Sequence, residues 1–123
     1  MDPKLQPQAV NLADRFSSFD DVWAPKIVAR YNGNEVRLVK TDGEWIWHKH
    51  DETDELFLIL EGELEMAFRD HVVTLGAGEL LIVPRGVEHR PAARKGVVKL
   101  LLIDPAGTPN TGDPATATPA VAL

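Results

Sequence analysis

A series of short apolar segments between residues 26 and 103 constrains this chain more than any other feature. The segments are rich in Val, Ile, Leu and aromatic residues, and Gly, Asn, Asp or Pro separates each from the next. This pattern is typical of successive antiparallel strands. The expected strands are Lys26–Tyr31, Glu35–Lys40, Glu44–His50, Glu55–Glu61, Glu63–Arg69, Val72–Leu75, Glu79–Val83, Val87–Pro91 and Val97–Ile103. Many short strands joined by glycine turns predict an all-β sandwich or barrel.

The two ends of the chain differ from this central part. Residues 1–25 carry apolar side chains at irregular three- and four-residue steps, which indicates a short helical turn or an N-terminal arm packed on the barrel. Residues 26–104 are the expected barrel. Residues 105–123 are rich in Pro, Ala and Thr and have little to bury, so we expect a partly disordered tail. A chain of 123 residues has room for one domain.

Composition excludes several classes of function. The 19 acidic residues outnumber the 13 basic ones, and the basic residues are scattered, so no basic face for nucleic acid is expected. The chain contains no cysteine, so nitrogen and oxygen atoms must bind any metal. It shows neither a secretory signal nor an apolar stretch long enough to span a bilayer. We therefore expect a cytoplasmic protein that acts on a small molecule and binds neither nucleic acid nor a membrane.

Three histidines and a glutamate form a candidate metal site. His48 and His50 stand in a His-x-His sequence, with Glu55 five residues after His50. Alternation along a strand places both histidines on one face, with Cα atoms about 7 Å apart, so their imidazoles are able to converge on one ion. Two histidines and a carboxylate form the set that binds non-haem Fe(II) and leaves coordination positions open. His89 follows a Pro-x-Gly turn, and only the fold is able to bring it to the other three residues.

The spacing of these residues resembles the paired motifs of the cupin family. The first motif appears as Gly43, His48, His50, Glu55 and Gly62. The second motif appears as Gly78, Pro84, Gly86 and His89. Gly43 stands one residue closer to His48 than in the commonest spacing, and Ala93 replaces an asparagine that is frequent in the second motif; neither position is a ligand. Two complete motifs in the correct order are far more specific than a single match.

This resemblance implies a cupin jelly-roll barrel, often a homodimer, in which one divalent ion is bound by His48, His50, Glu55 and His89. An isolated His-x-His is more often a pair of exposed or hydrogen-bonded strand histidines, and it is the complete second motif that favours the metal site. The residues do not distinguish Fe, Mn, Ni and Zn, because the identity of the bound metal depends more on cellular supply and coordination geometry than on ligand type. His71, at an expected hairpin tip, is interpreted as an ordinary surface residue.

Strand alternation also predicts the lining of the barrel. The residues expected to share the inward face with His48 and Glu55 are Ile46, Phe57, Ile59, Leu64, Met66 and Phe68. The residues expected to point outward are Trp45, Trp47, Leu56, Leu58 and Leu60. The other sheet, the N-terminal arm or a second subunit should cover this apolar outer surface. Arg37 and Lys40 lie on opposite faces of their strand, so a phosphate clamp is weakly supported.

Two classes of function fit these residues. The first is a metal-dependent enzyme that acts on a small molecule, and the family contains dioxygenases, lyases and isomerases. The apolar lining favours a dioxygenase over an isomerase of the mannose-6-phosphate type, although the latter stays an alternative. The second class is a non-catalytic module that binds or senses a small ligand, with a structural metal. No catalytic residue is assigned, because the sequence shows no dedicated general acid or base beside the four ligands, and a metal-bound hydroxide would need none.

Overall fold

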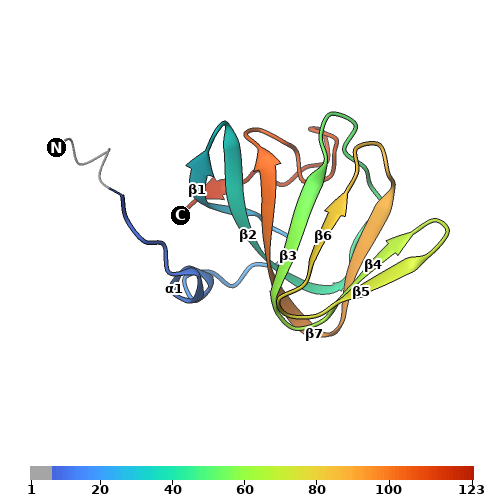
Figure 1. The fold of residues 1–123 in the computed structure, drawn as a ribbon, viewed down its shortest axis with the longest axis horizontal. Helices are drawn as coiled ribbons and strands as arrows, with labels where there is room; N and C mark the ends of the chain where they lie inside the picture. The colour runs from blue at the N-terminus through green and yellow to red at the C-terminus, as the bar shows by residue number, and fades with distance from the viewer. Residues whose placement is uncertain (1–6) are drawn as a thin grey trace.

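The computed structural model describes residues 7–123 as an all-β jelly-roll barrel with one short helix, as the sequence predicts (Figure 1). The elements are α1 (Leu12–Phe16), β1 (Lys26–Tyr31), β2 (Asn34–Glu44), β3 (Glu55–Glu61), β4 (Leu64–Phe68), β5 (Val72–Leu75), β6 (Leu80–Val83), β7 (His89–Pro105) and β8 (Val121–Ala122). The first six residues of the predicted N-terminal arm lie outside the described residues. Within residues 7–123, no helix has the length and apolar character needed to cross a membrane.

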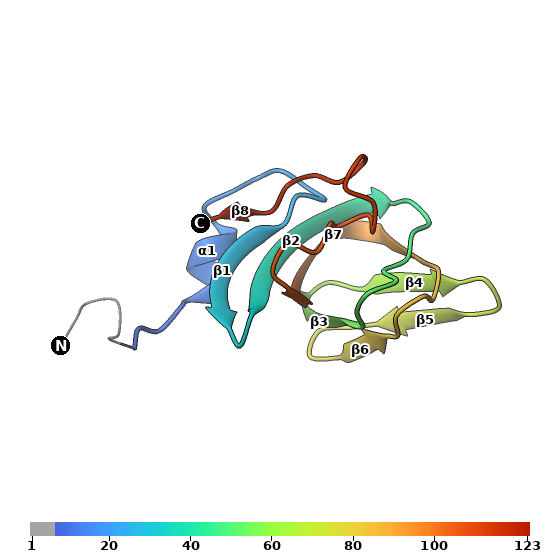
Figure 2. The same cartoon turned by 90° about the horizontal axis from the view of Figure 1, so that it is seen from above.

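Strand β7 connects the two sides of the barrel. Residues 89–92 of β7 pair with β4, residues 92–105 pair with β2, and residues 99–103 pair with β3. Strands β1 and β2 therefore curve along one side, and β3 to β6 lie along the other (Figure 2). All of these pairings are antiparallel. The consecutive strands β1 and β2, and β4 and β5, also pair in antiparallel fashion across short turns.

The predicted strand Glu44–His50 is wrong. Strand β2 instead continues from Asn34 to Glu44, with an irregularity in its pairing to β7 between Thr41 and Gly43. Gly43 has a φ of 72°, a left-handed conformation that glycine adopts without steric cost and that bends the strand. After Glu44 the chain leaves the sheet, and His48 alone in residues 45–50 keeps a β-bridge. Side-chain alternation therefore does not hold in this segment.

The predicted strand Val97–Ile103 and the last three residues of the predicted strand Val87–Pro91 belong to the single strand β7, whereas Val87 and Glu88 precede it. The connecting residues 92 and 93 pair with the end of β2 and stay extended. The polar sequence Arg94-Lys95-Gly96 resembles a turn, but the chain only changes partner there. Gly96 has a φ of 109° and residues 94–97 have no partner on β2, so the turn-like sequence marks an irregularity within one strand.

The barrel interior holds the main hydrophobic core. Its buried members are Val39, Phe57, Ile59, Leu64, Met66, Leu75, Val83, Ala93, Val98, Leu100 and Leu102. A second, smaller cluster forms on the outside, where Phe16 and Phe19 of the N-terminal arm bury Leu38 of β2. Helix α1 begins at Leu12, after Asn11, whose side chain accepts a hydrogen bond from the Asp14 amide at 3.0 Å. The sequence predicts a short helical turn or arm in this region, and α1 is that short helix.

The outer face of the four strands β2, β7, β3 and β6 carries two rows of aliphatic side chains. Cross-strand pairing sets the rows Val36, Ile103, Leu56, Ile82 and Leu38, Leu101, Leu58, Leu80. The N-terminal arm covers the end of the second row at Leu38, with Leu101 packed beside it. At the opposite end Leu80 is 59% exposed and Ile82 is 45% exposed. We call these two rows the outer aliphatic face.

Residues 105–123 return along the barrel and have defined partners, whereas the composition predicts a partly disordered tail. Strand β8 pairs in parallel with β1, and the amides of Val121 and Leu123 donate to the carbonyl oxygens of Pro25 and Ile27. Gly112 has a φ of 77°, and a Cβ there would overlap the carbonyl oxygen of Lys49. These are backbone contacts, which need no apolar side chains, so composition gives no sign of them.

Candidate metal centre

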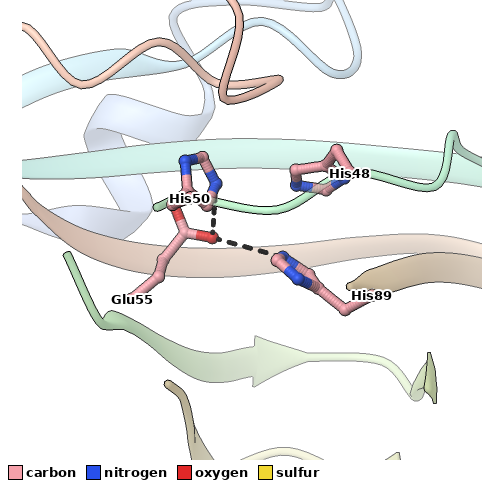
Figure 3. Close-up of side chains that lie close together, drawn as sticks. All are labelled: His48, His50, Glu55 and His89. Carbon is pink, nitrogen blue, oxygen red and sulfur yellow. Dashed lines mark ion pairs between the residues drawn. The ribbon is translucent and has the colours of Figure 1, made fainter. Parts of the chain in front are cut away.

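The four candidate ligands lie together inside the barrel (Figure 3). His48 and His50 come from the irregular segment after β2, Glu55 begins β3 and His89 begins β7. One potential ligand atom from each residue lies within 4.8 Å of the others, and all four residues are buried. Zinc, for example, lies about 2.0–2.2 Å from nitrogen and oxygen ligands, so a small inward shift of the side chains is enough for one ion to contact all four. The fold therefore brings together the residues that the sequence singles out.

Backbone hydrogen bonds position the three histidines. The amide of His48 donates to the carbonyl oxygen of His89 at 3.0 Å, and the amide of His89 donates to that of His48 at 2.9 Å. The amide of Gly86 donates to the carbonyl oxygen of His50 at 2.8 Å. The turn of the second motif therefore holds the His-x-His segment of the first motif in place.

Two of the imidazoles are oriented by backbone carbonyls. Nδ1 of His48 lies 3.0 Å from the carbonyl oxygen of Ile46, and Nδ1 of His89 lies 2.9 Å from that of Val87. A carbonyl oxygen only accepts, so each Nδ1 carries the proton and each Nε2 keeps its lone pair. This arrangement is the one that metal-binding histidines use to fix tautomer and ring orientation.

Several buried nitrogens of the site have no hydrogen-bond partner among residues 7–123. They are both ring nitrogens of His50 and Nε2 of His89. Nε2 of His50 lies 3.3 Å and Nε2 of His89 lies 3.7 Å from Oε1 of Glu55, along the dashed lines of Figure 3. A buried polar atom without a partner is costly, and a cation at the centre of the group would bind Nε2 of His89 and one ring nitrogen of His50. The residues therefore fit a divalent ion.

The electrostatics of the site favour the protonation states that bind metal. Burial, followed by the neighbouring His89, lowers the pKa of His48 from 6.5 to about 4, so this imidazole is neutral at pH 7. Burial opposes ionisation of Glu55, but the imidazoles of His50 and His89 outweigh burial and hold its pKa well below the usual range. The neutral imidazole of His48 and the ionised carboxylate of Glu55 are forms that bind first-row divalent ions.

A small cavity adjoins His48 and Glu55. Its volume is about 40 Å³, room for about three water molecules. The apolar part of its wall consists of Trp23, Val39, Trp45, Phe57, Leu100 and Leu102. Trp23 and Trp45 stack with ring centroids 5.2 Å apart and nearly parallel planes, and Trp45 presents its ring to His48 at 4.9 Å. The cavity is therefore flat-walled and largely apolar.

The residues predicted to line the barrel fall into three groups. Phe57 lines the cavity, whereas Ile59, Leu64 and Met66 lie in the core beside it and Phe68 packs against that core. Ile46 is 47% exposed, so the expectation that it faces inward is wrong. Trp45 was expected outside and lines the cavity instead. Both errors have one cause, because alternation was applied to residues 45–50, which form no strand.

Sequence reasoning missed a charged group at the side of the cavity. Nε and Nη2 of Arg37 donate to Oε1 of Glu35 at 3.1 and 2.6 Å, and Nη1 donates to the carbonyl oxygen of Thr108 at 2.8 Å. Asp104 lies beyond, 3.8 Å from Nη1. Burial and the neighbouring Glu55 carboxylate raise the pKa of Asp104 to about 9. The sequence carried a signal for this group. Glu35 and Arg37 are two residues apart on β2 and so share a face, and the acidic residue Asp104 directly follows the apolar residues 100–103 of β7.

Comparisons with known proteins agree with this fold and site. A cupin domain in a crystal structure from Shewanella frigidimarina is 45% identical, with a TM-score of 0.76, over 78% of this chain and 93% of that one. The protein NMB1881 of Neisseria meningitidis is 30% identical, with a TM-score of 0.73, over 80% of this chain and 100% of that one.

The sequence comparisons point the same way. The uncharacterised protein YdbB of Bacillus subtilis strain 168 is 39% identical over 74 residues, which make up 59% of this chain and 66% of that protein. The model of the cupin domain matches residues 34–104, which include all four candidate ligands. The chain belongs to the cupin family.

Proposed function

We propose that the protein binds one divalent first-row transition-metal ion and presents it to a small molecule in the adjoining cavity. The proposed ligands are His48, His50, Glu55 and His89. The observation that carries the proposal is the group of buried imidazole nitrogens that face one carboxylate and have no other partner among the described residues. Fe, Mn, Ni and Zn all accept this set of nitrogen and oxygen ligands.

We propose further that the site is an oxygenase centre for a small substrate. When bound, the ion would supply open coordination positions for a substrate oxygen and O₂. The chain itself supplies the orientation of the ligands through the carbonyls of Ile46 and Val87, and it supplies a wall that excludes water. The apolar cavity next to His48 supports a substrate with a flat apolar body.

The alternatives make different demands on the cavity. A sugar-phosphate isomerase needs a free cation, but the cation that lines the cavity, Arg37, already donates to Glu35 and Thr108. The non-catalytic binding module is favoured by the small size of the cavity and by the scarcity of free polar groups around it. The binding module would bind the same kind of ligand as the oxygenase but would not convert it to a product.

The metal is tested by elemental analysis of protein prepared without a metal-chelating tag. We expect about one equivalent of a first-row metal in the wild type, its loss in His48→Ala and its retention in His71→Ala. His71 is the matched control, because it is an exposed histidine outside the site. A wild-type protein that holds no such metal and takes up none on loading would disprove the proposal.

The reaction class is tested by oxygen uptake of the Fe(II)-loaded protein with small aromatic, thiol and diketone compounds. Uptake that depends on the compound and is lost in Glu55→Gln supports the oxygenase. Saturable binding of a compound without uptake, by protein that holds its metal, supports the binding module.

We also propose that the outer aliphatic face is covered by a second copy of the chain. Monomeric proteins rarely expose a large contiguous apolar patch, and the N-terminal arm covers only one end of this one. A flat face of aliphatic side chains without charges is complementary to itself, which a two-fold dimer requires.

A further inference from the structure

The cavity beside the candidate metal centre is too small for most ligands. Its volume is about 40 Å³ where it adjoins His48 and Glu55, whereas pockets that bind small molecules have volumes of roughly 300–1,000 Å³. A small molecule therefore reaches this side of the metal centre only if part of the cavity wall moves away.

A second and larger space lies beside His50. This cleft has a volume of about 440 Å³, which falls within the range of small-molecule sites. It is lined by His50, by the following turn at residues 51–53, and by residues 105–109, Gly112 and Pro114 of the C-terminal tail. The cavity and the cleft therefore border different ligands of the same candidate site.

One segment of the C-terminal tail borders both spaces. Residues 105–109 and Gly112 line the cleft, whereas Asn110 between them lines the cavity. Residues 107–112, which we call the lid segment, are therefore part of a wall that the cavity and the cleft share.

The lid segment is held by a few polar contacts. The carbonyl oxygen of Thr108 accepts a hydrogen bond from Nη1 of Arg37 at 2.8 Å. Nδ2 of Asn110 donates to the carbonyl oxygen of Trp23 at 3.4 Å, and Oδ1 of Asn110 accepts from the amide of Thr118 at 2.9 Å. Among the described residues, neither hydrophobic cluster includes a member from the C-terminal tail. Segments with few buried apolar contacts open locally at a lower free energy than the core around them.

Both ends of the C-terminal tail are attached to the sheet. The tail continues from β7 at one end, and β8 pairs with β1 at the other (Figure 2). Gly107 and Gly112 bound the lid segment, with φ values of 83° and 77°. Loops that move swing about a few such positions, which absorb the changes in φ and ψ. The lid segment is therefore able to move outward while both ends of the tail stay attached.

We propose that the lid segment covers the metal centre and that its outward movement joins the cavity to the cleft, which opens the route by which a metal ion and a small molecule reach the site. This inference rests on the proposed function, because the route serves a site that binds an ion and presents it to a small molecule. The joined space supplies the volume that the cavity lacks. The lid segment contains none of the four candidate ligands, so it controls how fast an ion exchanges and leaves the affinity for the ion unchanged.

The proposal is tested by the rates of zinc uptake and zinc release, with zinc alone as the probe. Uptake is followed after metal-free protein is mixed with zinc, and release is followed after zinc-loaded protein is mixed with an excess of a chromophoric chelator. Asn110→Ala removes two hydrogen bonds of the closed lid, so we expect both rates to rise about tenfold. The zinc affinity, which is the ratio of the two rates, should stay unchanged.

A second variant acts on the lid segment from outside both spaces. Thr111→Val removes the hydrogen bonds of Oγ1 with Asp113 and Thr116 and should also speed both uptake and release. Asn11→Ala is the matched control, because it removes an asparagine hydrogen bond at helix α1, and it should leave both rates at the wild-type values. Wild-type rates in both lid variants, or faster release without faster uptake, overturn the proposal.

Amide hydrogen exchange of the metal-free protein measures the opening of the lid segment directly. The amide of Gly112 donates to the carbonyl oxygen of Pro109 at 3.0 Å. It should exchange faster than the amides of β3 and β7 in the wild type, and faster still in Asn110→Ala. A Gly112 amide that exchanges as slowly as those of β3 and β7 overturns the proposal.

The zinc content of each sample distinguishes failure of the lid from failure of the proposed function. Wild type that holds one zinc ion but exchanges it at the same rate as the lid variants overturns the lid and leaves the metal site standing. Wild type that takes up no zinc overturns the metal site, and the route to it falls as well.

Discussion

The two faces of the sheet formed by β2, β7, β3 and β6 differ in where they place charged groups. The inner face buries charged groups, including Glu35, Arg37, Glu55 and Asp104. The outer face carries two rows of aliphatic side chains, and Leu80 at its edge is more than half exposed. The same four strands supply both faces, with successive residues alternating between them.

This difference indicates that both faces are incomplete in the isolated chain. Buried charges are retained only where they are paired or bind something, and exposed leucines in a contiguous patch are retained where they make contacts. On the proposed function, the inner face binds a metal ion, whereas the outer face contacts a second copy of the chain.

Removal of a ligand from the inner face should have the largest effect. His89→Ala deletes an imidazole that is completely buried, so we expect zinc affinity to fall more than about a hundredfold, beyond the usual loss from a residue that only supports a ligand. Competition with a chelator measures the zinc affinity. The control His71→Ala should bind zinc as tightly as the wild type. Equal affinity in His89→Ala and the wild type would remove His89 from the site.

A charge on the outer face should break the dimer and leave the metal in place. In Ile82→Glu, a carboxylate would have to lose its water at the interface, so we expect dissociation at protein concentrations where the wild type is dimeric. Sedimentation velocity measures the mass. Val72→Glu is the control, because Val72 is an equally exposed apolar residue on β5, outside the rows. A wild type that is monomeric at high concentration contradicts the proposed dimer.

Metal binding on the inner face should also depend on the packing of the C-terminal tail, whereas association through the outer face should not. In Gly112→Ala, the new Cβ meets the carbonyl oxygen of Lys49, next to His50. We expect the free energy of unfolding to fall by about 1–3 kcal/mol, with weaker metal binding. Gly107→Ala is the matched control, since Gly107 has a similar φ of 83° but nothing within 4 Å of the added Cβ. Equal losses in both variants would show that only backbone strain matters.

In protein stripped of metal, the buried ionisable groups of the inner face should make the free energy of unfolding depend on pH. Because the pKa of Asp104 is raised to about 9, the folded state keeps a proton that the unfolded state loses above about 4, and stability falls as pH rises. The lowered pKa of His48 has the opposite effect, with stability rising between about 4 and 6.5. Between about pH 4 and 6.5 the two effects on stability offset each other. Between pH 6.5 and about 9 only the effect of Asp104 remains, so stability should fall as pH rises.

Chemical denaturation across that pH range measures this effect. Asp104→Asn should abolish the fall, and Asp20→Asn should retain it. A wild-type protein whose stability stays level from pH 6.5 to 9 would contradict the assignment of the fall to Asp104.

The sequence by itself determined the all-β class, most of the strands and the set of residues that meet at the candidate metal site. Short apolar runs and glycine turns are local signals, and the paired motifs preserve spacing that the fold requires. His89 shows this best. It lies 34 residues from Glu55, yet its position in the second motif predicted that it lies beside His48, His50 and Glu55.

Only the tertiary structure decided which other residues join the site. The alternation rule failed for Ile46 and Trp45, because after Glu44 the chain leaves the sheet and loses the pairing that fixes side-chain direction. Arg37 and Asp104, 67 residues apart in sequence, became neighbours through the pairing of β2 with β7. Pairing between distant strands depends on how the whole chain closes into a barrel, so a local pattern can mark a residue as inward-facing but does not name its partner on another strand.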